Sequence, residues 1–187
     1  MPIMNPGVMT WQELLAYKQG QMKHYRDMFN LETFIETGTN SGDSVEFARH
    51  IFPAVYSVEL HPGRYELCSK RFAGMDNVHL FQGDSEVLLS TLLKKIPNKR
   101  ILFWLDAHAG GEEPELVGVG KHNFSGLFEL AEILRNPPTN SVIMVDDMYE
   151  VKPPHVCNHK ECGCLDELKR IAPDAVVEMS IARVVLP

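Results

Sequence analysis

The stretch FIETGTNSGDSVEF, residues 34–47, joins an apolar run to a segment whose apolar residues have helical spacing. An acidic residue, Glu36, precedes two glycines, Gly38 and Gly42, that lie four residues apart. Glycines free the backbone of a tight turn, so that amides at the start of a helix can face a negative ligand group. The stretch therefore predicts a strand, a tight turn that holds a ligand, and a helix. An ordinary turn without a ligand is the alternative.

Strands and helices alternate on both sides of this turn. Thr10 and Glu13 form a capping-box pattern that opens a helix over residues 11–28. Further helices are predicted over residues 41–50, 62–72, 85–96, 124–134 and 165–171. Strands are predicted over residues 33–36, 55–59, 78–82, 101–105, 141–145, 175–179 and 182–186.

This order of elements predicts an α/β fold in three α/β/α layers. Repeated strand–helix units favour a doubly wound, mostly parallel sheet with helices on both faces. The last two of the seven strands have almost no chain between them, so they must form a C-terminal antiparallel β-hairpin.

Composition limits the classes of protein that fit. The 187 residues, 44% of them hydrophobic, suit a single domain over residues 1–187, with the helix at about 10–28 as an accessory cover. The net charge of −7 and the lack of a Lys/Arg cluster disfavour a nucleic-acid partner. No apolar run reaches the roughly 20 residues of a membrane span, and no signal-peptide pattern opens the chain. We therefore expect a cytoplasmic protein without a membrane partner, in a reducing compartment.

Acidic residues follow the first five predicted strands, at the end where open α/β sheets bind their ligands. They are Glu36, Glu59, Asp84, Asp106 and the pair Asp146–Asp147. One such residue would be an ordinary helix cap, but five positions on one edge predict a site.

Two of these positions suit a nucleoside. Glu59 is placed to accept hydrogen bonds from ribose hydroxyls, and Asp84 with Ser85 can bind an adenine edge. The alternative for Glu59 is an acid at the start of the helix near Pro62, and the alternative for Asp84 and Ser85 is an N-cap of the next helix. A nicotinamide cofactor would use similar geometry, but its G-x-G-x-x-G pattern does not fit E-T-G-T-N-S-G.

FIETGTNSG, VYSVEL, QGDS and the closing hairpin resemble class I S-adenosylmethionine-dependent methyltransferases over about residues 33–186. The usual first motif of that family is acid-x-Gly-x-Gly-x-Gly, and Asn40 takes the place of the middle glycine. The resemblance implies a Rossmann-like fold with S-adenosylmethionine as cofactor and the methionine part held around Gly38 to Ser41. The implied cofactor-binding residues are Glu36, Thr37, Gly38, Thr39, Asn40, Ser41, Gly42, Glu59 for the ribose, Asp84 and Ser85 for the adenine, and Asp106.

Asp106, Asp146 and Asp147 are expected to converge, because the fourth and fifth strands are neighbours in this fold. Three carboxylates repel each other unless a cation or protons compensate, and Mg²⁺ suits oxygen ligands. His108 could then take the proton of a substrate hydroxyl. The pattern is similar to macrocin-type, metal-dependent O-methyltransferases, in which a second acid stands where His108 stands here. The alternative is that Asp146 and Asp147 only cap or hydrogen-bond the next loop.

The segment CNHKECGC contains Cys157, His159, Cys162 and Cys164, which are ligand types suited to Zn²⁺. A surface loop with free thiols, or a disulfide formed on oxidation, is the alternative. The glycine-rich segment 109–123 is expected to overhang the ligand edge and to close over substrate.

The sequence thus predicts a methyltransferase that acts on an oxygen of a small-molecule acceptor, with Asp106 and His108 as catalytic residues and a divalent metal assisting. A homo-oligomer through the N-terminal helix is a further option. The alternatives are a non-catalytic S-adenosylmethionine- or nucleotide-binding protein, and a nicotinamide-dependent oxidoreductase.

Overall fold

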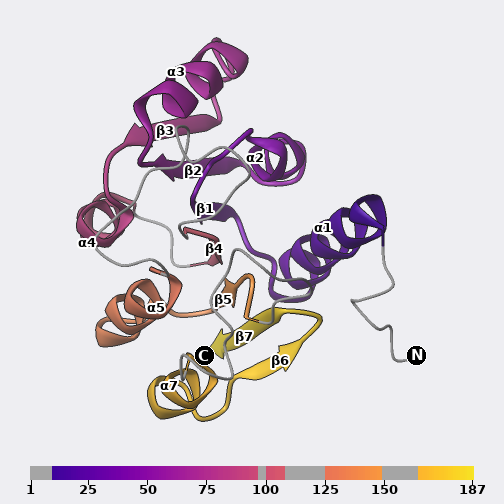
Figure 1. The fold of residues 1–187 in the computed structure, drawn as a ribbon, viewed down its shortest axis with the longest axis vertical. Helices are drawn as coiled ribbons and strands as arrows, with labels where there is room; N and C mark the ends of the chain where they lie inside the picture. Colours follow the sequence, from indigo (N-terminus) through magenta and orange to yellow (C-terminus); the bar gives the residue numbers. More distant parts are fainter. Residues whose placement is uncertain (1–9, 97–99, 108–124, 149–163) are drawn as a thin grey trace.

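The computed structural model describes residues 10–96, 100–107, 125–148 and 164–187. Within these ranges, seven strands form one sheet in the order β3-β2-β1-β4-β5-β7-β6 (Figure 1). The strands are β1 (Thr33–Thr37), β2 (Ala54–Glu59), β3 (Val78–Gln82), β4 (Ile101–Leu105), β5 (Ser141–Val145), β6 (Val176–Glu178) and β7 (Ile181–Leu186). Strands β1 to β5 run parallel, and β7 pairs antiparallel with β5 and with β6. The predicted mostly parallel sheet with a closing antiparallel hairpin is confirmed.

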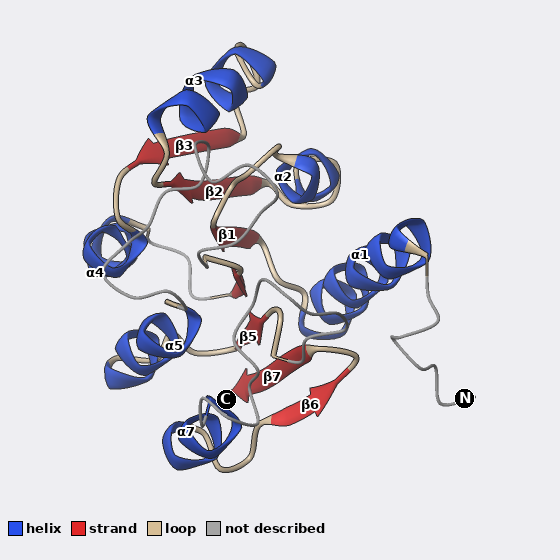
Figure 2. Ribbon diagram, viewed as in Figure 1, coloured by secondary structure: helices blue, strands red, loops and turns tan. Residues whose placement is uncertain are grey.

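Helices cover both faces of this sheet, as Figure 2 shows. α1, α2 and α3 lie on one face, and α4, α5 and α7 lie on the other. Their bounds are α1 (Trp11–Phe29), α2 (Asp43–Ala48), α3 (Pro62–Arg71), α4 (Ser85–Lys95), α5 (Gly126–Arg135) and α7 (Cys164–Ile171). In the described part of the chain, no helix has the length and apolar character needed to cross a bilayer. Because β1 to β5 run parallel, their carboxyl ends lie along one edge of the sheet.

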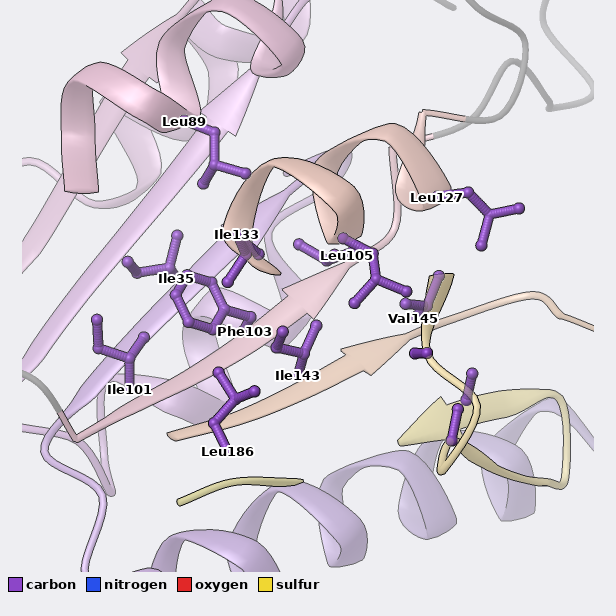
Figure 3. Close-up of a cluster of buried hydrophobic side chains, with 14 of the residues drawn as sticks. Ile35, Leu89, Ile101, Phe103, Leu105, Leu127, Ile133, Ile143, Val145 and Leu186 are labelled. Atoms are coloured by element: carbon purple, nitrogen blue, oxygen red, sulfur yellow. The ribbon is translucent and has the colours of Figure 1, made fainter. Parts of the chain in front are cut away.

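The core consists of two apolar clusters, one on each face of the sheet. Successive strand residues point to opposite faces, so Phe34 belongs to the cluster under α1, α2 and α3, while Ile35 belongs to the other. Figure 3 shows Phe103 and Ile143 gathered beneath α5 in this second cluster. β1, β4 and β5 are buried along their whole length, as the apolar runs at residues 101–105 and 141–145 predicted.

Several predicted boundaries differ from the structure by one or two residues, and backbone conformation explains two of these differences. The helix after β1 begins at Asp43 instead of residue 41, because Gly42 caps it with a left-handed φ of 82°. β6 ends at Glu178 because Met179 and Ser180 both have positive φ, 51° and 72°. Positive φ at both central residues is the requirement of a type I′ hairpin turn, which usually takes Asn or Gly. The hairpin was therefore predictable from its short link but not from its turn residues.

The burial of β5 gives a stability prediction. Ile143 is fully buried between β4 and β7, so Ile143→Ala leaves a cavity and should lower the free energy of unfolding by about 2–5 kcal/mol. Val185 on β7 is 48% exposed, and Val185→Ala should cost less than about 1 kcal/mol. Urea unfolding of both variants measures this difference. Equal losses would contradict the burial of β5.

Candidate functional site

The turn after β1 lies directly against the chain that leaves β4. Gly38 has a φ of +84°, and a Cβ at this position would lie 2.6 Å from the backbone oxygen of Asp106. Its amide donates to the backbone oxygen of Val58 at the end of β2, over 2.9 Å. Only glycine allows this approach, because any side chain would displace backbone atoms. The turn is therefore fixed between the ends of β2 and β4.

Packing against α3 explains why residue 42 is a glycine, whereas the sequence analysis assigned Gly42 to a turn that faces a ligand. Its φ is +82°, and a Cβ would lie 2.7 Å from the ring of Phe72, just after α3. Between the two glycines, Asn40 also adopts a left-handed conformation, with a φ of 51°. Asparagine tolerates that region better than most residues. Asn40 thus takes the place of the middle glycine while keeping a backbone that glycine would favour.

Glu59 ties the end of β2 to this turn. Its side chain is buried, and its two oxygens accept hydrogen bonds from the backbone amides of Asn40 and His61, each over 2.8 Å. A carboxylate has about four acceptor positions, so these two bonds leave capacity for ligand hydroxyls. The structure places Glu59 at the predicted ligand edge, in contact with the turn predicted to hold the methionine part.

The side chain of Glu36 is buried and forms hydrogen bonds with residues of α2 and β2. The hydroxyl of Ser44 donates to Oε1, and that of Ser57 donates to Oε2 over 2.6 Å. Ser57 also shares a hydrogen bond of 2.6 Å with the hydroxyl of Thr39. Burial raises the pKa of Glu36 to about 8, although both serine hydroxyls act in the opposite direction. The chain of hydroxyls connects β1, β2 and α2 around the turn.

Glu129 of α5 is a further buried acid, which the sequence analysis missed. It accepts hydrogen bonds from the hydroxyls of Ser85, over 2.5 Å, and Thr37, over 2.7 Å. Burial raises its pKa to about 7. The available signal was its place four residues before Ile133 and next to Leu130, on the buried face of the helix. Glu129 joins the end of β1 to the start of α4.

Asp84 and Ser85 begin α4. The carboxylate of Asp84 accepts from the amide of Glu86 over 3.0 Å, so the predicted N-cap is present. Ser85 directs its hydroxyl to Glu129. The structure therefore gives each residue a local role beside its predicted contact with adenine.

Asp106, Asp146 and Asp147 lie at the ends of β4 and β5 with an unexpected neighbour, Lys18 of α1. The Lys18 Nζ is 2.5 Å from Asp146 Oδ2 and 3.8 Å from Asp147 Oδ1. Asp146 Oδ1 accepts from the amide of Asp147 over 2.8 Å. The Asp146 side chain is fully buried, whereas Lys18 is 12% and Asp147 34% exposed.

Charge and burial act against each other in this cluster. Burial alone lowers the pKa of Lys18, but Asp146, Asp106 and Asp147 outweigh it and hold the pKa above its ordinary value. Burial, together with the charges of Asp106 and Asp147, raises the pKa of Asp146 to about 7, although Lys18 acts in the opposite direction. The ammonium therefore stays charged and supplies the positive charge that the three aspartates need.

The predicted metal sites are not supported. In residues 10–96, 100–107, 125–148 and 164–187, no group of three or more His, Cys, Asp or Glu side chains is arranged to hold a metal ion. At Asp146 the donors do not fit Mg²⁺, because an ammonium already contacts Oδ2. The predicted base, His108, lies outside the described residues, as do Cys157, His159 and Cys162, and of Cys164 only the backbone, at the start of α7, is described.

Lys18 was also missed by the sequence analysis, although the pattern contained a signal. Met22, Tyr25 and Phe29 follow it at helical spacing and pack toward the core. A lysine on this apolar face must either extend its ammonium group to solvent or pair it with a buried acidic group. Here it finds Asp146.

A cleft of about 1190 Å³ lies between α1, the hairpin and the segment after α7. Its lining includes Gln21, Tyr25, Pro173 and Arg183. None of the described residues predicted for the site lines it, so we do not assign it to the candidate site.

The sheet order, the closing hairpin and the turn after β1 together define the fold of class I S-adenosylmethionine-dependent methyltransferases. The O-methyltransferase TomG of Streptomyces achromogenes, solved with S-adenosylmethionine, is similar, with a TM-score of 0.65 and 15% identity over 92% of this chain and 81% of its own. An O-methyltransferase of Bacillus cereus, solved with S-adenosylhomocysteine, has a TM-score of 0.64 and 13% identity over 95% and 82%.

Other similar structures are larger: the chain spans about half, 52%, of the amino pentose methyltransferase CalS10 from Micromonospora echinaspora, with a TM-score of 0.49 and 16% identity over 75% of this chain. Neither a comparison with protein families nor one with curated proteins gives a match.

The contact between Gly38 and Asp106 can be tested by mutation. Gly38→Ala should lower the free energy of unfolding by roughly 2–5 kcal/mol, since positive φ and overpacking each add a cost. Gly74 is the matched control, because it has a φ of +78° but nothing within 4 Å of an added Cβ. Gly74→Ala should cost about 1–2 kcal/mol. Denaturant unfolding that shows equal losses would contradict the close approach.

The buried Glu129 should make stability depend on pH. Its folded pKa, about 7, is above its ordinary value of 4.5, so the folded state holds the proton more tightly. The contribution of Glu129 to stability is then fully present below pH 4.5 and is lost as pH rises through about 7. Glu129→Gln should remove a loss on the order of 3 kcal/mol over this window. Parallel stability–pH curves for the variant and the wild type would contradict this.

Proposed function

We propose that the chain is an S-adenosylmethionine-dependent methyltransferase that acts on an oxygen atom of a small-molecule acceptor. The observation that carries the proposal is the joining of the turn after β1, Glu59 and the start of α4 at one edge of a class I methyltransferase fold. The two similar structures solved with this cofactor or its demethylated product support it.

The residues at this edge fit the cofactor. The turn from Gly38 to Ser41 would hold the methionine part, Glu59 would accept hydrogen bonds from the ribose, and Asp84 with Ser85 would contact the adenine. Glu59 suits this role because the amides of Asn40 and His61 hold its carboxylate in one position. Glu36 and Glu129 are positioning residues, since their oxygens accept from hydroxyls of the protein.

S-adenosylmethionine, when bound, supplies an electrophilic methyl group. The protein then has two tasks, to align the acceptor oxygen with the methyl carbon and to accept one proton. The backbone of Asp106 is close to the turn through Gly38, and Asp106 is our candidate residue beside the reacting groups. His108, two residues further along the chain, remains our candidate base.

Cofactor binding is the first test. Calorimetric titration with S-adenosylhomocysteine should show binding to the wild type. Glu59→Gln should bind about 10–100-fold more weakly, because it loses charged hydrogen bonds to the ribose. Glu66→Gln, an exposed glutamate of α3, is the control and should bind like the wild type. No binding to the wild type, with NAD bound instead, would favour the oxidoreductase alternative.

Turnover separates an enzyme from a binding protein. Transfer of labelled methyl groups from S-adenosylmethionine to a panel of hydroxylated acceptors should proceed in the wild type. It should fall by about 10²–10⁴-fold in His108→Ala while cofactor affinity is kept. Binding without transfer to any acceptor would favour the non-catalytic alternative.

A further inference from the structure

Lys18 reaches from α1, near the start of the chain, to the acids that follow β5. Its ammonium contacts both of these carboxylates, at 2.5 Å for Asp146 and 3.8 Å for Asp147. The pair with Asp146 is enclosed, since the carboxylate is fully buried and the lysine is largely covered. This distinguishes it from the exposed pair of Lys23 and Asp27 on the same helix.

The three aspartates create a negative potential that favours a cation in this position. Asp146 lies in the interior, and Asp147 and Asp106 are near enough to add to the negative potential there. A buried carboxylate without a counter-charge is strongly unfavourable. In a metal-dependent site a divalent ion would neutralise such a group, whereas here an ammonium of the protein already does so.

The local backbone is also built around this arrangement. Asp147 has a φ of 54°, an uncommon conformation for a residue other than glycine. Its amide is thereby directed to Asp146 Oδ1, while Lys18 contacts Oδ2. Oδ1 of the buried carboxylate accepts a hydrogen bond, and Oδ2 forms the ion pair with Lys18. A divalent ion at Oδ2 would lie next to the Lys18 ammonium, and repulsion between the two cations disfavours its binding unless the lysine moves away.

We propose that Lys18 is the resident cation of this site and takes the place of a divalent metal. The acidic pair after β5 is then a receptor for an ammonium group, and α1 contributes a charge to the site instead of only covering it. Where the inference concerns turnover, it rests on the proposed function: the acceptor oxygen would be oriented next to Lys18 and Asp147, and methyl transfer would not need a divalent ion.

The test is divalent-ion binding by the full-length protein after treatment with EDTA. Wild type should show no saturable binding of Mg²⁺ or Mn²⁺ by calorimetry and no change of melting temperature with either ion. Lys18→Met should melt at a lower temperature, because Asp146 loses its partner, and should recover part of that loss with added ion. Its ion affinity should exceed that of the wild type by about tenfold or more. Lys23→Met is the matched control and should behave like the wild type.

Two further variants keep the test decisive if Lys18→Met does not fold. Lys18→Arg keeps the charge and should fold without responding to ions. Lys18→Met combined with Asp146→Asn removes both charges and should fold without binding ions. Saturable binding of Mg²⁺ by the wild type, or an ion response of Lys18→Arg as strong as that of Lys18→Met, would overturn the proposal.

These ion titrations contain no S-adenosylmethionine, so their failure is distinct from failure of the proposed function, which the titration with S-adenosylhomocysteine decides. If transfer is observed, it should persist in EDTA for the wild type. Loss of transfer in EDTA that Mg²⁺ restores would also overturn the proposal.

Discussion

Burying carboxyl groups is the constraint on which the edge of this sheet depends. Four of them, Glu36, Glu59, Glu129 and Asp146, are buried there, and each must find donors because a buried polar or charged group without partners is strongly unfavourable. The donors differ: serine and threonine hydroxyls for Glu36 and Glu129, backbone amides for Glu59, an ammonium and an amide for Asp146. Each solution connects elements that are distant in the sequence, so the acids fix the relative positions of the strand ends as well as the character of the site.

The fold was predictable because its determinants are local. Apolar runs, helix caps and the short link between the last two strands each act within a few residues, and together they predict a mostly parallel sheet with a closing antiparallel hairpin. The sequence predicted the turn after β1, but it did not show the packing contacts that require its two glycines. Gly38 meets the backbone of Asp106 and Gly42 meets the ring of Phe72, and neither partner is adjacent in sequence. A local motif therefore indicated where glycine was needed without showing what it contacts.

The site was harder to predict for the same reason. The acids at the strand ends follow from parallel topology, which brings the carboxyl ends together. The partners of these acids cannot be derived in this way, because Lys18 and Glu129 lie on helices and belong to no recognised motif. A charged residue on the apolar stripe of a helix was the sign in both cases. Since three acids without a visible partner suggested a metal, the missing lysine changed the chemical interpretation of the whole edge.

The pairing of Lys18 with Asp146 also affects how local the contacts of this fold are. Lys18 lies on the first helix, and Asp146 follows β5. Contacts between residues far apart in the sequence close long loops, which has an entropic cost and slows folding. The ion pair therefore makes complete docking of α1 depend on the presence of β5 in the sheet.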